Sequence, residues 1–328
     1  MITELINKIT KRSSNEIVKW LPIKQSFINE EEYTNVIHDK GYVIAGKLTE
    51  DQLSQLRKLY SELHNFQQQE GGMFYSVYSR DVAYRKKVND DIRAILKPTY
   101  DTLFHDYKTV INSYIVKVSG PESEFSLHQD STGLDEMKYS CVSVWIPLQD
   151  TNNTNGCLSV VPHSHKMFSP YRGISFPQQF ENISNTVRKY LQPIEMKAGE
   201  ILLFDNRLVH TSGVNSLGED RVVVMSGIFP SDAKIVSCFK DTTVENSPIE
   251  IIEQADDYLI TFENFFHDCT CRPETGTLIG TSNWDTSQMS EKQFLVLCKE
   301  YGLKENSNCD YWKASERQSI IGEPVTKQ

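Results

Sequence analysis

The order of apolar and polar positions predicts helices in the first third of the chain and short strands in its middle. Residues 1–40 are polar and charged, with weak helical periodicity, and are expected to form a surface extension. Residues 41–46 are a short apolar run between glycines, which is typical of a buried strand. Thr49 and Gln52 form a capping box, and the apolar residues after it repeat at helical spacing. We therefore expect an amphipathic helix over residues 50–66.

A second helix is expected after a polar break. Asn89 is the candidate N-cap of this helix, and Pro98 is expected to end or kink it. One or two further helical turns through residues 100–107 would complete a helical front that spans residues 1–109.

From Val110 onward the apolar runs are short, rich in β-branched residues and separated by turn signals such as the Asn-rich residues 150–156. The predicted strands are 110–118, 140–148, 157–162, 194–196, 201–204, 208–210 and 221–229. Many short strands with turns between them favour a β-sandwich or barrel. The long segment 163–192 contains several Pro and Gly residues and a short helical stretch near 187–191, and it is where a cover over an active site is expected.

The remaining residues, 231–328, show less pattern. Ser290 and Gln293 form a second capping box that predicts a helix, and the last twenty residues are polar. We find no internal repeat and no long linker. The sequence therefore predicts a single domain over residues 1–328, with a β core at 110–230 and a C-terminal extension at 231–328.

The composition indicates which broad class of protein this chain belongs to. Of the 328 residues, 39% are hydrophobic and 24% charged, which indicates an ordinary globular protein. The net charge of −10, without any basic run, argues against binding to nucleic acid. Seven scattered cysteines do not resemble a disulfide framework. The first residues lack an apolar stretch of signal-peptide length, and no apolar run approaches about 20 residues, so we expect neither a signal peptide nor a membrane span. We expect a cytoplasmic protein that acts on a small molecule, without membrane or nucleic-acid partners; its oligomeric state stays open.

Two histidines and an aspartate are the strongest chemical signal. His128 and Asp130 lie two residues apart at the end of a predicted strand, so their side chains are expected on one face. His210 closes a later strand. Two imidazoles and one carboxylate form the facial triad of non-haem Fe(II) oxygenases. Arg221 opens the following strand, and its guanidinium suits a carboxylate because its planar fork matches two oxygens.

Other polar residues admit alternatives. His163 and His165 could form a second metal pair, but a turn after Pro162 is the favoured interpretation. The segment 267–271 contains His and Cys residues, yet structural zinc needs a second ligand pair that is absent; a packed loop is favoured, with a pocket rim as the alternative. Gln129 could face either the substrate or a backbone partner.

Several motifs together resemble the phytanoyl-CoA dioxygenase family of Fe(II)/2-oxoglutarate oxygenases, over roughly residues 41–232. The motifs, in the family's order and with similar spacing, are Leu127–Asp130, Val144–Leu148, Asn155–Leu158, Val161–Lys166 and His210–Gly213 through Arg221. The resemblance implies a mainly β fold with flanking helices around a double-stranded β-helix, the jelly-roll or cupin-like core. His163 stands where the family usually has glycine or a small residue, so it is either a substrate contact or a turn variant.

The resemblance also implies roles for individual residues. His128, Asp130 and His210 would hold Fe(II), and 2-oxoglutarate would chelate the metal. Arg221 and Ser212 would bind the distal carboxylate of 2-oxoglutarate. Trp145 matches a position beside this co-substrate, although its strand pattern is equally compatible with a core residue.

The implied activity is a dioxygenase reaction with O2. An unactivated C–H bond of an amino acid, a natural-product intermediate or an acyl derivative would be hydroxylated, with release of succinate and CO2. Asp130 argues against halogenation, which needs that ligand position free for chloride. Desaturation, cyclisation and epoxidation use the same residues. A β-helix protein that binds the metal and 2-oxoglutarate without turnover is the alternative from another class.

Overall fold

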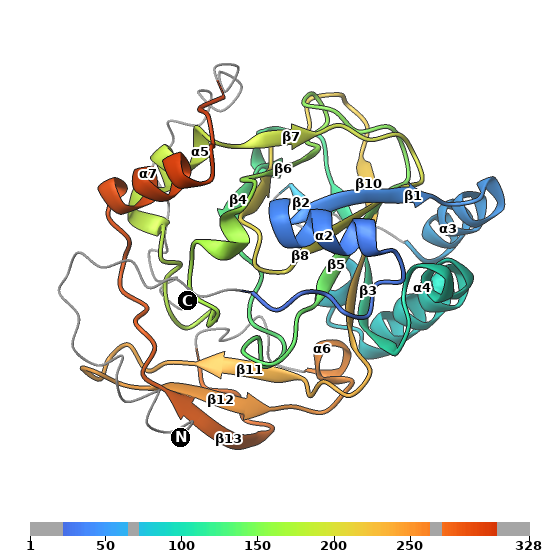
Figure 1. Ribbon diagram of the computed structural model, residues 1–328. Helices are drawn as coiled ribbons and strands as arrows, with labels where there is room; N and C mark the ends of the chain where they lie inside the picture. The colour runs from blue at the N-terminus through green and yellow to red at the C-terminus, as the bar shows by residue number, and fades with distance from the viewer. Residues whose placement is uncertain (1–21, 65–71, 263–270, 307–328) are drawn as a thin grey trace, which may run out of the picture.

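Two antiparallel β-sheets form the middle of the molecule in the computed structural model, which describes residues 22–64, 72–262 and 271–306 (Figure 1). The larger sheet has the strand order β1-β8-β5-β10-β3-β2 and the smaller one β4-β9-β6-β7. The eight central strands are β3 (Tyr107–Lys117), β4 (Phe125–His128), β5 (Val142–Pro147), β6 (Leu158–Val160), β7 (Gln192–Ile194), β8 (Glu200–Asp205), β9 (His210–Ser212) and β10 (Arg221–Pro230).

The chain passes back and forth between these two sheets. From β3 to β10 each strand lies in the other sheet from its predecessor, except for β6 and β7, which pair in the smaller sheet. This winding is that of a double-stranded β-helix, or jelly roll. Every strand expected between residues 110 and 229 is present, with ends shifted by a few residues.

The helical front adds both helices and edge strands to this core. It contains α2 (Glu31–Lys40), β1 (Tyr42–Lys47), α3 (Glu50–Leu63), β2 (Met73–Tyr75) and α4 (Val82–Leu103). Strand β1 pairs with β8 and β2 with β3, so the front extends the larger sheet at both edges. Helices α3 and α4 pack on the outer face of that sheet, where their apolar residues join those of β5 and β10 in one core. The capping box at Thr49 is confirmed.

The expected start of the second helix was wrong, whereas the expected helical turns after Pro98 are part of the same helix. Helix α4 begins after Asp81, whose side chain accepts a hydrogen bond from the amide of Tyr84, and it continues through Pro98 to Leu103. Asn89 lies inside the helix, where its side-chain oxygen accepts from the backbone amide of Asn112 at 3.0 Å. A proline inside a helix costs about 3 kcal/mol. Burial of several large side chains along one face, at roughly 1.5–3 kcal/mol each, outweighs that cost.

The residues after 231 contain more structure than their sequence pattern suggested. A three-stranded antiparallel sheet, β11-β12-β13, lies beside the core at the bottom of Figure 1. Its strands are β11 (Val236–Phe239), β12 (Ile249–Glu253) and β13 (Thr277–Ser282), with helix α6 (Tyr258–Thr261) between the last two. The helix expected after Ser290 is confirmed as α7 (Glu291–Glu300), and it packs near α5 (Ser184–Arg188) in a second apolar cluster.

Four short 3₁₀ helices complete the secondary structure of the described ranges: Ser76–Tyr78, Pro121–Ser123, Ser164–Lys166 and Glu181–Ile183. Within the same ranges, no helix has the length and apolar character needed to cross a bilayer.

A buried row of hydrogen bonds connects α4 to the larger sheet. The hydroxyl of Tyr100 donates to Ser226 Oγ at 2.8 Å, and Ser226 Oγ donates to Asn112 Oδ1 at 2.7 Å. All three side chains are buried. Because a buried polar atom that loses its partner keeps its desolvation cost, this row favours one orientation of the helix on the sheet.

We predict that Tyr100→Phe lowers the free energy of unfolding by about 1 kcal/mol, because Ser226 loses the donor to its oxygen. Urea denaturation measures this change. Tyr107→Phe is the matched control, since the Tyr107 hydroxyl donates to Asp101 at the surface; its effect should stay within about 0.5 kcal/mol. Equal costs for the two substitutions would contradict the stabilising role of the buried row.

Candidate active site

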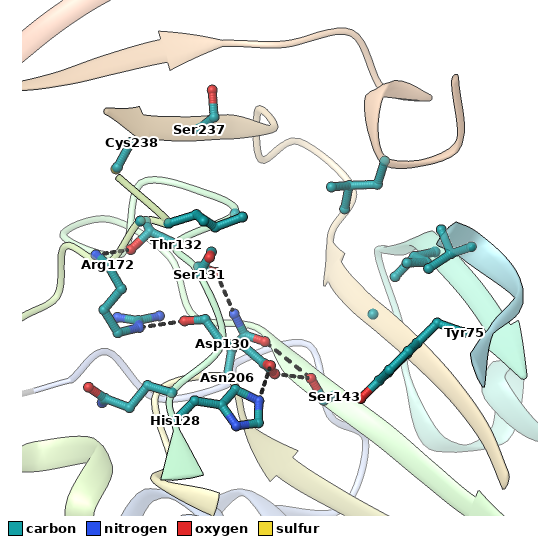
Figure 2. A pocket seen from close by; sticks show the side chains of 18 of the residues that line it. Tyr75, His128, Asp130, Ser131, Thr132, Ser143, Arg172, Asn206, Ser237 and Cys238 are labelled. Carbon is teal, nitrogen blue, oxygen red and sulfur yellow. Dashed lines mark hydrogen bonds and ion pairs between the residues drawn. The ribbon is translucent and has the colours of Figure 1, made fainter. Parts of the chain in front are cut away.

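The pairing of β4 with β9 brings the predicted ligands together. His128 ends β4 and stands opposite His210, the first residue of β9. Asp130 follows β4 by two residues. One ligand atom from each of the three side chains lies within 4.8 Å of the other two, and no other such group of His, Cys, Asp or Glu occurs in the part of the chain that the structure describes. Figure 2 shows the His128 imidazole turned toward Asp130.

Hydrogen bonds to the backbone fix both imidazoles. Nδ1 of His128 lies 2.9 Å from the carbonyl oxygen of Ser126, and Nδ1 of His210 lies 2.9 Å from that of Leu208. Because a carbonyl oxygen only accepts, each Nδ1 carries the hydrogen, and each Nε2 keeps a free lone pair. These Nε2 atoms lie 3.5 Å (His128) and 3.9 Å (His210) from Oδ1 of Asp130. Three lone-pair donors therefore converge on one point.

The second oxygen of Asp130 is held from behind. Ser143 Oγ lies 3.3 Å from Asp130 Oδ2 and 3.1 Å from Asn206 Oδ1. The amide nitrogen of Asn206 donates to the carbonyl oxygen of Ser131 at 3.1 Å, which fixes the Asn206 side chain (Figure 2). Partners of this kind orient the ligands of metal sites. Oδ1 of Asp130 thus remains the oxygen that faces the imidazoles.

A buried ion pair fixes the backbone of the same residue. Nε of Arg172 donates to the carbonyl oxygen of Asp130 at 2.7 Å. The other guanidinium nitrogens bind both carboxylate oxygens of Glu136, at 2.6 and 2.8 Å, and both side chains are almost fully buried. A bidentate, buried pair has a fixed geometry. The loop that carries Asp130 is therefore held in place.

The environment favours the protonation states that bind a metal. Burial would raise the pKa of Asp130, but the neighbouring imidazoles and Arg172 outweigh it and bring that pKa to about 2. Burial lowers the pKa of His210 to about 4, with a further contribution from the charge of His128. At neutral pH Asp130 is a carboxylate and His210 a neutral imidazole. A set of two imidazoles and one carboxylate fits Fe(II).

Arg221 faces the same cavity and has no counter-charge. It is 2% exposed, at the start of β10, and among the described residues no carboxylate or carbonyl pairs with it; its buried Nε has no partner. Its guanidinium carbon lies 5.5 Å from the centre of the Trp145 ring. Burial lowers the pKa of Arg221 to about 10, so the group stays charged at neutral pH. An uncompensated buried charge costs several kcal/mol, which indicates an anionic ligand.

Ser212 and Trp145, the other two predicted co-substrate residues, also line this cavity. Ser212 lies on β9 opposite Phe125. Trp145 lies on β5 and is almost fully buried, in a cluster with Leu158 and other apolar residues. Trp145 is therefore both a core residue and part of the cavity wall, and its two sequence interpretations are compatible.

The remaining histidines lie elsewhere. His163 is outside the cavity wall, has a positive φ of 64°, and its Nδ1 lies 2.7 Å from the carbonyl oxygen of Asp39. Its ring stacks on Tyr301 at 5.5 Å. The positive φ and the backbone contact are those of a turn residue, which is one of the two alternatives for His163. His165 is fully buried, with Nε2 3.1 Å from the carbonyl oxygen of His38.

Two further sequence alternatives have different outcomes. The side-chain amide of Gln129 donates to the carbonyl oxygen of Arg207, which is the backbone partner that one interpretation expected. Residues 267–270 lie outside the described residues, whereas Cys271 lines the cavity. The expected cover also contributes, because residues 172–178 line the cavity.

Sequence reasoning missed the residues that support the ligands. Ser143 and Asn206 are small polar residues at or near ordinary predicted strands, and Arg172 lies in a segment without periodicity. No local pattern distinguishes them, since their partners are 13 to 63 positions away in the chain. Tyr75 was seen only as one of several aromatic residues, yet it lines the cavity close to the charges of Arg221 and Asp130.

Comparisons with known proteins agree with this site. Residues 37–223 match the family model of Phytanoyl-CoA dioxygenase (PhyH), which is more than half of the chain. Phytanoyl-CoA dioxygenase 1 of Oryza sativa subsp. japonica is 35% identical over 120 residues, which cover 35% of this chain and 43% of that protein. A Dictyostelium discoideum phytanoyl-CoA dioxygenase domain-containing protein 1 homolog is 24% identical over 204 residues, or 60% of this chain and 66% of that protein. The chain thus matches less than half the length of the Oryza protein.

A solved structure gives a weaker likeness. The crystal structure of EctD from S. alaskensis with 2-oxoglutarate and 5-hydroxyectoine superposes with a TM-score of 0.47 at 15% sequence identity. The superposition covers 69% of this chain and 87% of that one.

We predict that His128→Ala and His210→Ala each weaken metal binding by on the order of 100-fold, since loss of a partner even beyond the ligands costs 10- to 100-fold. Calorimetric titration of the metal-free protein with Co(II) measures the affinity. His163→Ala is the control, because that histidine lies in a turn outside the cavity, and it should bind as the unaltered protein does. Unchanged affinity in His210→Ala would exclude the three residues as the metal site.

A buried lysine lies next to Arg221. Lys117 stands opposite Arg221 in the pairing of β3 with β10 and is fully buried. Its Nζ donates to the carbonyl oxygens of Ser123 and Ser212, the latter at 3.4 Å. Burial, and then the charge of Arg221, lower the pKa of Lys117 to about 6. The folded protein thus favours the neutral amine.

We predict that Lys117→Met stabilises the protein increasingly as the pH falls from 9 to 6. Between a folded pKa near 6 and an unfolded pKa of about 10.4, the unfolded chain holds the additional proton, so the unaltered protein gains stability as the pH rises, by up to about 1.4 kcal/mol per pH unit. Methionine has no such proton. Urea unfolding of both proteins at several pH values gives the difference, and Lys108→Met, which removes a lysine ion-paired at the surface with Asp256, is the control. A difference that stays constant with pH would contradict a neutral Lys117.

Proposed function

The chain belongs to the phytanoyl-CoA dioxygenase family, and we propose that it is an Fe(II)- and 2-oxoglutarate-dependent dioxygenase that hydroxylates an unactivated C–H bond of a small molecule. In this reaction one oxygen atom of O2 enters the C–H bond and the other enters 2-oxoglutarate, which becomes succinate and CO2. His128, Asp130 and His210 hold the iron. Arg221 binds the carboxylate of 2-oxoglutarate that is remote from the metal.

The observation that carries this proposal is the buried, unpaired guanidinium of Arg221 in the same cavity as the three ligands. A facial set of two imidazoles and a carboxylate leaves the opposite positions of a metal open. 2-Oxoglutarate carries a keto acid at one end and a carboxylate at the other. A molecule that is held at both ends needs a metal and a cation within one cavity. The three ligand residues would hold the metal, and Arg221 is the cation.

Ser212 supports the remote end of the co-substrate. It lies two residues after His210 on β9 and lines the cavity, so its hydroxyl is available as a second donor to the carboxylate. Trp145 lies against the guanidinium of Arg221 and forms the wall beside it. Together these residues orient the co-substrate and exclude water from its carboxylate.

Iron with bound 2-oxoglutarate and O2 would supply the oxidising power. The protein orients the substrate and excludes water from the site. The carboxylate of Asp130 is held by Ser143, and its carbonyl oxygen by Arg172. An aspartate that is fixed in this way keeps the third ligand position filled. This favours transfer of oxygen to the substrate over transfer of a halide.

The test is 2-oxoglutarate binding and consumption. We predict that Arg221→Gln weakens binding of 2-oxoglutarate to the Fe(II) protein by on the order of 100-fold, because a buried charge pair is lost. Calorimetry without O2 measures binding, and succinate formation after O2 is admitted measures turnover. Arg93→Gln, which alters an exposed arginine of α4, should leave both unchanged.

Three outcomes separate the alternatives. Failure of 2-oxoglutarate to bind the unaltered protein would refute the proposal. Tight binding without succinate from any candidate substrate would favour a protein that binds without turnover. Succinate formation with a product that lacks a new oxygen atom would indicate desaturation or cyclisation in place of hydroxylation.

A further inference from the structure

The cavity is larger than the metal and co-substrate require. Its volume is about 1380 Å³, whereas pockets for small molecules usually measure about 300–1,000 Å³. Iron and one small dicarboxylic acid fill a minor part of this space. The remaining space has to accommodate the substrate, so the residues that line it indicate the chemical character of the substrate.

A row of aromatic side chains runs from the metal ligands to the C-terminal part of the chain; we call it the aromatic wall. It consists of Phe125, Tyr75, Tyr78, Phe262 and Tyr258, all of which line the cavity. The row begins at the ring of Phe125, which meets the ring of His128 edge-on at 4.5 Å.

Each member of the aromatic wall contacts the next. The successive ring centres are 5.8, 5.1, 6.5 and 6.4 Å apart, from Phe125 through Tyr75, Tyr78 and Phe262 to Tyr258. These separations are those of favourable ring pairs. Neighbouring rings are tilted by 47 to 59° against one another, and the guanidinium of Arg85 lies 4.5 Å from the centre of the Phe262 ring. The row therefore offers a stepped aromatic surface to a bound molecule.

The opposite side of the cavity is apolar as well. It is formed by residues of β10, of the C-terminal sheet and of the segment near residue 176, namely Phe176, Phe229, Val236 and Phe239. Ligand cavities take orientation from a few polar groups and affinity from apolar walls.

Apart from Arg221, the arginines of the described cavity wall are already paired. Arg172 binds Glu136, Arg272 binds Glu250, and Arg221 is reserved for the co-substrate. The other charged side chains in the wall beyond Asp130 are the carboxylates Glu181 and Glu274.

This distribution of charge disfavours anionic substrates. The phosphates of an acyl-CoA or the carboxylate of a free amino acid would lose hydration without gaining a cation. Both would also meet the field of two carboxylates on a protein with a net charge of −10. An uncharged molecule has no such cost.

We propose that the substrate is an uncharged, multi-ring molecule with a large apolar skeleton, and neither an acyl-CoA thioester nor a free amino acid. The rings stack on the aromatic wall, and the C–H bond to be oxidised lies at the end near Phe125 and His128. This inference rests on the proposed function for the reaction, but the selectivity of the cavity is measurable by binding alone.

The experiment uses two fluorescent probes that share one ring skeleton and differ in charge. N-phenyl-1-naphthylamine is neutral, and 8-anilinonaphthalene-1-sulfonate carries one negative charge. Both are titrated into the full chain with Zn(II) and 2-oxoglutarate, so that turnover plays no part. We expect the neutral probe to bind at least tenfold more tightly than the sulfonate.

Variants locate the binding in the cavity. Tyr78→Ala interrupts the aromatic wall and should weaken the neutral probe about tenfold, whereas Tyr301→Ala removes an aromatic side chain outside the cavity and should have no effect. Phe239→Lys adds a cation to the opposite side. It should raise the affinity for the sulfonate about tenfold, and this gain does not depend on the fold of Tyr78→Ala.

Two results would overturn the inference: preferential binding of the sulfonate to the unaltered protein, or displacement of the neutral probe by hexadecanoyl-CoA more readily than by a neutral steroid such as testosterone. The proposed function is tested by a different measurement, succinate formation, which requires O2. The binding measurements do not require O2, so the two proposals can fail independently.

Discussion

The register between β4 and β9 is the constraint on which the site depends. It places His128 opposite His210, and each imidazole is turned by a carbonyl two residues before it in the chain. Because side chains alternate along a strand, a slip of one residue would move one imidazole to the other face of the sheet. Asp130 follows the end of β4 by two residues and would move with it. The double winding of the chain is what brings these two strands, about eighty residues apart, into one pair.

The second constraint is charge. Lys117 and Arg221 stand opposite each other on β3 and β10, both are buried, and within the described ranges neither forms an ion pair with a carboxylate. Two adjacent buried cations are costly. The protein accommodates them differently: the pKa of Lys117 falls to about 6, whereas Arg221 stays charged and faces the cavity. A carboxylate that binds Arg221 would also stabilise the charged form of Lys117, and its binding would then be linked to proton uptake through one pair of strands.

Much of the core could be predicted from sequence, because the signals that define its strands and helices lie close together in the chain. Alternation, turn residues and the capping boxes at Thr49 and Ser290 act over a few residues, so the strands between 110 and 229 and two helices were found. The start of α4 was misplaced because Asn89 and Asp81 are both good caps; only the buried contact between Asn89 and Asn112, 23 positions apart, decides between them. The ligands were found by their spacing and their resemblance to a family. Their supports, Ser143, Asn206 and Arg172, were not, because long-range contacts alone give these residues a role.

The family match covers some of the residues that line the cavity and leaves others outside. The match to the family model ends at residue 223, early in β10. The three ligands, Ser212 and Arg221 lie before that point. Phe229, Val236, Phe239, Tyr258, Phe262 and Arg272, which line the part of the cavity left for the substrate, lie after it. Family membership therefore bears most directly on the part of the cavity that contains the predicted metal ligands. The C-terminal sheet and α6 supply much of the remaining lining, and Tyr75, Tyr78 and Phe125 join it from within the matched residues. In this part Arg272 is paired with Glu250, so the lining has to be interpreted from its own chemistry.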